Sequence, residues 1–137
     1  MRRFFSGVMV CALACGACTT QGYKRCNSLE GSTQVLTEYL VQISIELEKY
    51  NNPEESLHNI QKYTQNSQKE IDVCVDFINH AIENMTHEEV LKHHEAYISD
   101  PRVKHFLDTQ DKFHEKATPE QIETLDGLLT PFLLLSE

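Results

Sequence analysis

The sequence predicts an all-α protein, an up-and-down antiparallel helical bundle of four to five helices. Two observations favour this fold class. Residue patterns typical of helix starts occur four times after residue 50, and apolar residues recur at spacings of three and four behind each of them. After residue 28 no segment shows the sustained apolar/polar alternation of a half-buried strand, and no Asn-Gly or Asp-Gly pair marks a hairpin. Short connections make neighbouring helices antiparallel, so an up-and-down bundle is expected.

The length and net charge of the chain limit the number of domains and the kinds of partner that are expected. A chain of 137 residues is long enough for one hydrophobic core and too short for a second independent one. It carries 12 Lys and Arg against 21 Asp and Glu, a formal net charge of −9. Because an acidic surface repels phosphate groups, no nucleic acid partner is expected.

Residues 1–17 have the three-part layout of an export signal. Met1-Arg2-Arg3 is basic, residues 4–13 are mainly apolar, and the small residues Ala14, Gly16 and Ala17 follow. The apolar run is too short to span a bilayer as a helix. With cysteines at the expected cleavage point, residues 1 to about 20 resemble a bacterial lipoprotein signal peptide. That resemblance implies cleavage directly before a cysteine that then carries lipid, and attachment to a membrane through that lipid.

Cys18 is the favoured lipidation site, and Cys15 is the alternative. Gly16-Ala17 gives Cys18 the small residues that precede a lipidated cysteine, although Cys15 occupies the position where such signals usually have Leu. Ala12-Leu13-Ala14 also fits cleavage of an ordinary soluble export signal, and an uncleaved core helix is a further interpretation. Removing residues 1–17 removes two Arg and gives a net charge of 10 − 21 = −11.

Cys26 and Cys74 are predicted to form a disulfide. Lipidation at Cys18 leaves these two cysteines as an even pair for an oxidising compartment. If the chain folds back at Asn51-Asn52, residue 26 lies opposite roughly residue 77, within about one helical turn of Cys74. The alternative is a free, buried Cys74 on the apolar face of its helix.

A polar tether is expected over residues 18–31, and the bundle domain over residues 32–137. The first helix is predicted over residues 32–50, where five apolar side chains form one stripe: Leu36, Tyr39, Leu40, Ile43 and Leu47. The second is predicted over residues 53–84, behind the cap Asn52-Pro53-Glu54-Glu55. Its stripe is interrupted over residues 63–69, and this polar gap indicates either a break or a solvent-exposed middle.

Three further helices are predicted over residues 87–98, 101–116 and 119–130. They begin behind Thr86, Asp100-Pro101 and Thr118-Pro119. Their apolar stripes are, in order, Val90, Leu91, His94 and Ile98; Val103, Phe106, Leu107, Gln110 and Phe113; Ile122, Leu125, Leu128 and Leu129. Phe132-Leu133-Leu134-Leu135 follows. Four consecutive apolar residues cannot share one helix face, so this segment is either extended and buried or partly exposed for a partner.

Histidine is the enriched residue type, and four histidines define a possible metal site: His87, His93, His94 and His105. If residues 87–98 and 101–116 pair antiparallel about Ser99-Asp100, His94 lies near His105. Two imidazoles and a carboxylate would suit zinc or copper. A core or surface role for these histidines is favoured over metal binding, and a pH-sensing role remains an alternative because imidazole titrates between about pH 5 and 8.

The sequence favours a non-enzymatic function. It contains no His-Glu-x-x-His, no Gly-rich phosphate loop and no Gly-x-Ser-x-Gly motif, so neither an enzyme nor a cofactor is expected. The favoured function is that of a cell-envelope lipoprotein, lipid-anchored with its acidic bundle in the periplasm or at the cell surface. The bundle would serve as an interaction or structural module for a protein partner. The alternatives are a periplasmic metal- or pH-responsive module built on the four histidines, and an anionic inhibitor or immunity-type protein for a basic partner.

Overall fold

The protein is helical over the residues that the structure, a computed structural model, describes, namely 24–49 and 51–135. The predicted signal segment, with Cys11, Cys15 and Cys18, lies outside these residues. The all-α prediction is confirmed, but the number of α-helices is six within the described residues, not four or five. The elements are η2 (Lys24–Asn27), α3 (Leu29–Lys49), α4 (Pro53–Asn66), α5 (Gln68–Glu83), α6 (His87–Ser99), α7 (Pro101–Lys116), α8 (Pro119–Leu129) and η3 (Thr130–Leu135).

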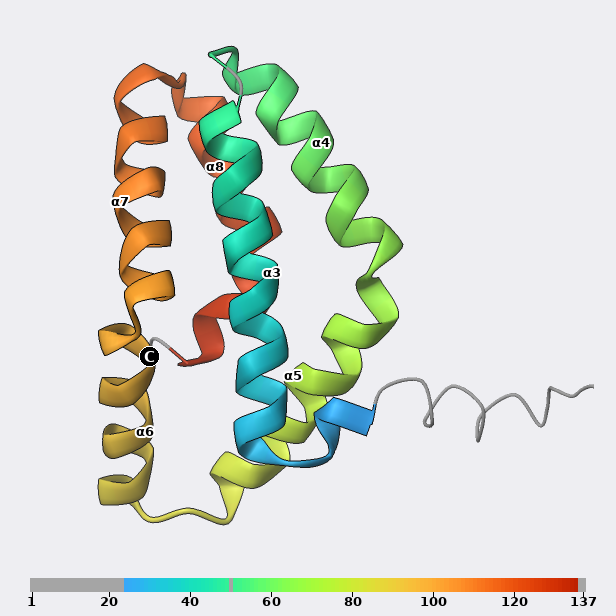
Figure 1. The fold of residues 1–137 in the computed structure, drawn as a ribbon, viewed down its shortest axis with the longest axis vertical. Helices are drawn as coiled ribbons and strands as arrows, with labels where there is room; N and C mark the ends of the chain where they lie inside the picture. The colour runs from blue at the N-terminus through green and yellow to red at the C-terminus, as the bar shows by residue number, and fades with distance from the viewer. Residues whose placement is uncertain (1–23, 50, 136–137) are drawn as a thin grey trace, which may run out of the picture.

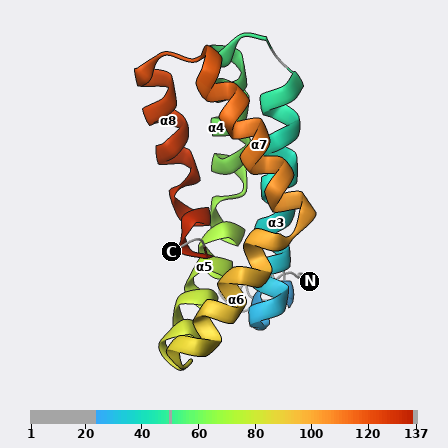
Figure 2. The same cartoon turned by 90° about the vertical axis from the view of Figure 1, so that its left-hand side faces the viewer.

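The chain runs along the long axis of the molecule four times, in alternating directions (Figures 1 and 2). Helix α3 makes the first passage, α4 and α5 together the second, α6 and α7 together the third, and α8 with η3 the fourth. Helix α3 packs against α7 on one side and against α4 and α5 on the other, while α8 packs against α4. In the described part of the chain, no helix is both long enough and apolar enough to cross a membrane.

The four predicted helix starts are present, each with its capping hydrogen bond. The side chains of Asn52, Thr86, Asp100 and Thr118 accept hydrogen bonds from backbone amides two or three residues further on, at 2.8–3.2 Å. At Thr118 the bond is reciprocal, since its own amide donates to the Gln121 side chain at 2.9 Å. Caps satisfy amides that the first helical turn leaves without a partner, which is why these starts can be predicted locally.

The predicted second helix is two helices, because the chain breaks at Ser67. This residue has φ −110° and ψ 10°, and its amide donates to the Thr64 carbonyl oxygen at 3.2 Å instead of continuing the helical pattern. Of the two interpretations of the polar gap over residues 63–69, the break is therefore the one observed. Because the chain changes direction at Ser67, both α4 and α5 contact α3 (Figure 1).

The first α-helix begins at Leu29, three residues before the predicted start, and η2 occupies residues 24–27, so part of the segment predicted as a tether, residues 18–31, has helical structure. Ser28 opens it, because its hydroxyl accepts from the Gly31 amide at 2.9 Å and its carbonyl accepts from the Ser32 amide at 2.9 Å. Glycine is a poor helix former, which is why the sequence pattern placed the boundary after Gly31. The glycine is needed there because the Arg25 carbonyl lies against it.

The core is built on α3. All five residues of its predicted stripe are buried, together with Ile60, Ile71, Cys74 and Ile78 from the second passage and Val103, Phe106, Phe113, Leu125 and Leu129 from the third and fourth. The predicted stripe of α6 is wrong. Tyr97 is its buried residue, whereas Leu91 and Ile98 are exposed by 46% and 37%, and Leu107 on α7 by 43%.

The C-terminal apolar segment forms the 3-10 helix η3 and is not extended. Phe132 is buried within it and packs against Tyr39 of α3, with ring centroids 6.5 Å apart. Phe132 therefore belongs to the core. The segment is buried at this residue, as the first of the two alternatives predicted, but it is helical and not extended.

Candidate functional site

The N-terminal end of the bundle is fixed by a disulfide. Cys26 of η2 and Cys74 of α5 lie with their sulfur atoms at bonding distance and their Cα atoms 4.8 Å apart, as the cysteine parity predicted. Both side chains are buried, by contrast with the exposed residues on either side of Cys26. The bond closes a sequence separation of 48 residues and joins the first described turn to the middle of the second passage.

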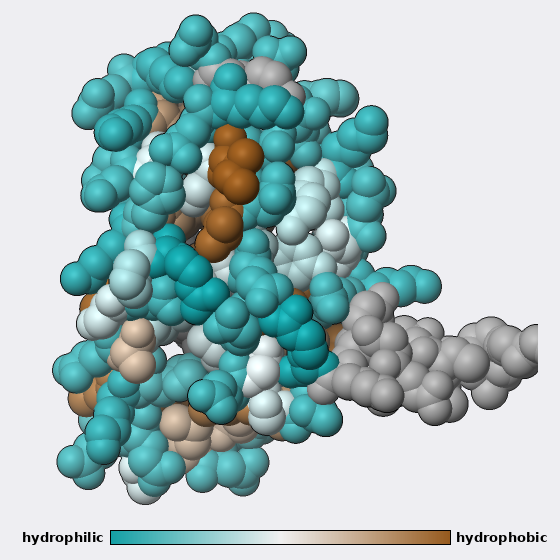
Figure 3. Space-filling view, in the orientation of Figure 1, coloured by the Kyte–Doolittle hydropathy of each residue, from teal (hydrophilic) through white to brown (hydrophobic). Residues whose placement is uncertain are grey.

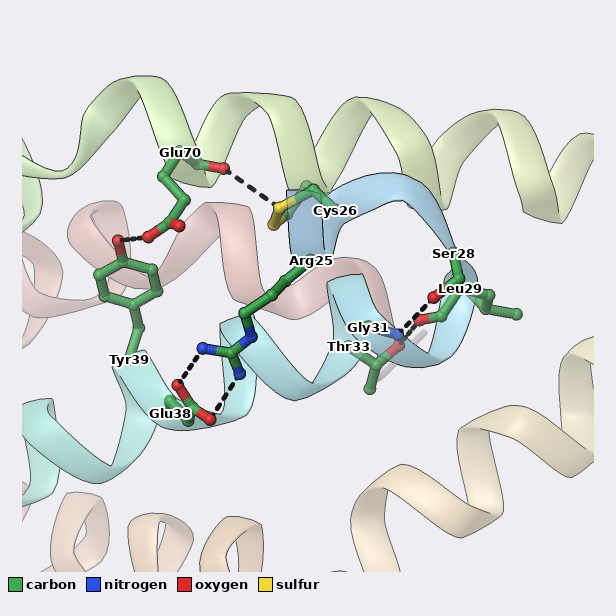
Figure 4. Close-up of a disulfide and its surroundings, with 10 residues drawn as sticks. Arg25, Cys26, Ser28, Leu29, Gly31, Thr33, Glu38, Tyr39 and Glu70 are labelled. Carbon is green, nitrogen blue, oxygen red and sulfur yellow. Dashed lines mark hydrogen bonds and ion pairs between the residues drawn. A yellow bond between two sulfur atoms is a disulfide. The ribbon is translucent and has the colours of Figure 1, made fainter. Parts of the chain in front are cut away.

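Polar contacts surround this disulfide (Figure 4). Arg25 donates two hydrogen bonds to the Glu38 carboxylate, at 3.0 and 2.6 Å, and this pairing holds the pKa of Glu38 below its usual value. The Tyr39 hydroxyl donates to the Glu70 carboxylate; burial and, second, this hydrogen bond raise the pKa of Tyr39. These four residues and Tyr63 border a hollow of about 310 Å³. The Arg25–Glu38 pair joins η2 to α3, and the Tyr39–Glu70 hydrogen bond joins α3 to α5.

The structure does not bring the predicted histidines together. His93 Nε2 lies 3.2 Å from the Thr33 hydroxyl oxygen, and His105 Nε2 lies 3.2 Å from a carboxylate oxygen of Glu48. Thr33 and Glu48 are 15 residues apart on α3, which corresponds to about 22 Å along a helix. The predicted proximity of His94 to His105 is therefore wrong. Residues 24–49 and 51–135 contain no group of three His, Cys, Asp or Glu placed to hold a metal ion.

His94 and His105 lie apart because the chain does not reverse its direction at Asp100. A helical hairpin needs a loop of about two to five residues, and here Asp100 alone separates α6 from α7. The third passage therefore bends at Asp100 and continues in the same direction (Figure 1). His87 is exposed at the start of α6, and His94 is half-buried on the same helix.

A cleft of about 490 Å³, with both apolar and polar residues in its lining, lies at this bend, between α3 and the junction of α6 with α7. We call it the bend cleft; Thr33, Gln34, His93, Asp100 and Arg102 line it. Arg102 donates to both carboxylate oxygens of Asp100, at 3.1 and 2.8 Å, and to the Gln34 side-chain oxygen at 3.0 Å. The guanidinium keeps the pKa of Asp100 below its usual value. The bend is thus tied to α3 by a fully hydrogen-bonded contact.

His93 is the histidine of the bend cleft, and its charged form is disfavoured. Burial lowers the pKa of its imidazole. The Thr33 hydroxyl donates its only proton to the Leu29 carbonyl oxygen at 2.7 Å, so it accepts from His93 Nε2. Neutral His93 accordingly carries its proton on Nε2, and protonation adds a positive charge inside the cleft.

Sequence reasoning identified the disulfide and missed both polar clusters. Arg25 lies 13 residues before Glu38, and Gln34 lies 68 residues before Arg102. Neither separation corresponds to a helical spacing, so no periodic signal connects the partners. The one local signal was Arg102, two residues behind the cap Asp100, where a guanidinium can reach back to its carboxylate.

Comparison of this chain with protein-family models, curated proteins and solved structures found no match. The fold and the site define a small, disulfide-stabilised, all-α domain with an acidic composition. Its function has to be inferred from its own residues.

Proposed function

We propose that this protein is exported, is acylated at Cys18, and presents its bundle from the cell envelope as a non-enzymatic module for a protein partner. The observation that carries this proposal is the buried Cys26–Cys74 disulfide. Such bonds form and persist in oxidising compartments and are rare in reducing ones. A disulfide therefore agrees with the export that the sequence pattern of residues 1–17 predicts.

The geometry at η2 supports a short connection to the membrane. Cys18 precedes Lys24, where η2 begins, by six residues, which reach at most about 22 Å when fully extended. The disulfide holds the end of that connection on α5, so lipid at Cys18 would keep the η2 side of the bundle nearest the bilayer. A net charge of −11 for residues 18–137 gives no attraction to anionic lipids, so several acyl chains on one residue would be needed for firm attachment.

Cys18→Ala and Cys15→Ala form a matched pair that tests the tether. The full chain would be expressed in a bacterium with its own signal, and its distribution between soluble and membrane fractions measured. We expect the wild type and Cys15→Ala to be acylated and membrane-bound, and Cys18→Ala to lose the acyl group. Loss of acylation in Cys15→Ala but not in Cys18→Ala would move the site to Cys15, and a wild type without acyl mass would refute the tether.

A second candidate function, a response to pH, is supported by His93. Because its pKa is lowered in the folded protein, the unfolded chain takes up a proton on this imidazole more readily. The stabilising contribution of neutral His93 is therefore present above its ordinary pKa of 6.5 and is lost as the pH falls below that value. The other titratable groups that line the cleft are Glu30, Tyr97, Asp100 and Arg102.

Replacement of His93 is expected to flatten the dependence of stability on pH. The free energy of unfolding in urea would be measured at about pH 7.5 and about pH 5, on either side of the ordinary titration of imidazole. We expect His93→Gln to lose less stability between these values than the wild type, and the exposed control His87→Gln to behave as the wild type. Equal losses in the wild type and His93→Gln would rule out a pH response at this residue.

A further inference from the structure

Helices α7 and α8 are consecutive in the chain but pack mainly on different neighbours. Helix α7 lies on α3, and α8 lies on α4, so the seam between α7 and α8 is the loosely packed side of the bundle. Figure 2 shows the two helices diverging from the turn that joins them. An apolar hollow of about 70 Å³ opens on this seam.

The hollow, which we call the seam hollow, has a buried floor and an exposed apolar rim. Leu40 of α3, Phe106 of α7 and Phe132 of η3 contribute to the floor and are at most 5% exposed. Ile98 and Leu107 contribute to the rim and are 37% and 43% exposed. Its volume is several times the roughly 10–15 Å³ that a cavity needs to hold one water molecule, which leaves room for an aliphatic side chain.

Isolated exposed apolar residues are common on protein surfaces and do not by themselves indicate a binding site. The rim residues differ from these because they border a hollow. Ile45 on α3 provides the comparison. It is exposed by 46%, and Figure 3 shows hydrophobic surface along α3, yet Ile45 lines none of the hollows described above.

The charges beside the seam hollow are mainly acidic. On α7, Asp111 and Glu115 follow Leu107 by four and eight residues, which places them on its side of the helix, whereas Asp108 is rotated from Leu107 by about 100°. Lys104 is on that side too, whereas Lys112 and Lys116 are rotated from Leu107 by about 140° and 180°. Helix α8 carries Glu120, Glu123 and Asp126 and no Lys or Arg.

We propose that the seam hollow binds an amphipathic helix of a partner protein, with Lys or Arg on its flanks and one leucine or isoleucine inserted between Ile98 and Leu107. Helix-in-groove recognition uses such apolar anchors at helical spacing. The acidic residues on both sides favour a basic helix and would speed its association at low salt. This inference rests on the proposed interaction function and specifies the chemistry of the partner.

The test uses the oxidised full chain and a synthetic helical peptide with leucines at spacings of three and four and lysines elsewhere. Affinity would be measured by titration calorimetry, with a second peptide that has alanine in place of every leucine. We expect Leu107→Ala to weaken binding about tenfold, the loss of one well-placed apolar contact. Ile45→Ala, equally exposed but remote from the hollow, should bind as the wild type.

Three further results would decide against the proposal. Equal binding of the leucine and alanine peptides, or equal weakening by Leu107→Ala and Ile45→Ala, would indicate non-specific attraction to an acidic surface. Self-association of the chain that Leu107→Ala abolishes would assign the hollow to a second copy. Asp111→Asn/Asp126→Asn should lower the affinity at low salt and reduce its salt dependence. Fractionation of Cys18→Ala measures membrane attachment independently of peptide binding. The tether and the helix-binding proposal can therefore fail separately.

Discussion

The Cys26→Ala/Cys74→Ala double variant is expected to lose about 4 kcal/mol of unfolding free energy relative to the oxidised wild type. The disulfide closes a sequence separation of 48 residues, and loop closure of that length is worth about this much in the chain-entropy model. A small domain has a total stability of only about 5–15 kcal/mol, so the loss is a large part of the whole. The melting temperature should fall by on the order of 15 °C.

Reduction of the wild type provides the control for this variant. The oxidised wild type, the reduced wild type and the double variant would be unfolded in urea under identical conditions. We expect the two proteins without the bond to be similar in stability and both to be well below the oxidised protein. A difference of under about 1 kcal/mol between oxidised and reduced wild type would show that packing alone holds η2 on α5.

Gly31→Ala is expected to destabilise the fold by about 1–3 kcal/mol, the usual cost of forcing an atom into a packed site. A Cβ at this position would lie 2.1 Å from the Arg25 carbonyl oxygen and 2.9 Å from the Ser28 hydroxyl oxygen. The closer contact is to backbone, and that backbone is held by the neighbouring Cys26 disulfide. The side chain therefore fits only if η2 moves.

Gly127→Ala is the matched control, because it makes the same substitution in helix α8 where a Cβ meets nothing within 4 Å. Alanine is the better helix former by about 1 kcal/mol, so Gly127→Ala should be neutral or stabilising. The melting temperatures of the two oxidised variants, each compared with that of the wild type, show whether each substitution destabilises or stabilises the fold. An unchanged melting temperature for Gly31→Ala would contradict the close approach of η2 to α3.

The helix starts could be predicted from sequence because each depends on residues close together in the chain. Asn52, Thr86, Asp100 and Thr118 all cap as their patterns indicated. Directions between helices could not be predicted in the same way. The bend at Asp100 is fixed by Arg102 against Gln34, a contact across 68 residues.

The same difference separates the parts of the candidate site that could be predicted from those that could not. The disulfide follows from parity and from the reversal of the chain near Asn51-Asn52. The seam hollow depends on α8 packing on α4 and not on α7, so spacing alone placed Leu107 and Ile98 in the core. The predicted proximity of His94 and His105 was wrong for the same reason, since it required a hairpin at Asp100 that the chain does not form.

The central claim, a lipid-tethered and disulfide-stabilised envelope protein, is tested most directly by intact mass. The chain would be expressed in a bacterium with its own signal, purified in detergent and weighed with and without reductant. We expect an N-terminus at Cys18 that carries added acyl mass, and a gain of two hydrogens on reduction. An unmodified N-terminus with Cys26 and Cys74 as free thiols before reduction would contradict the account.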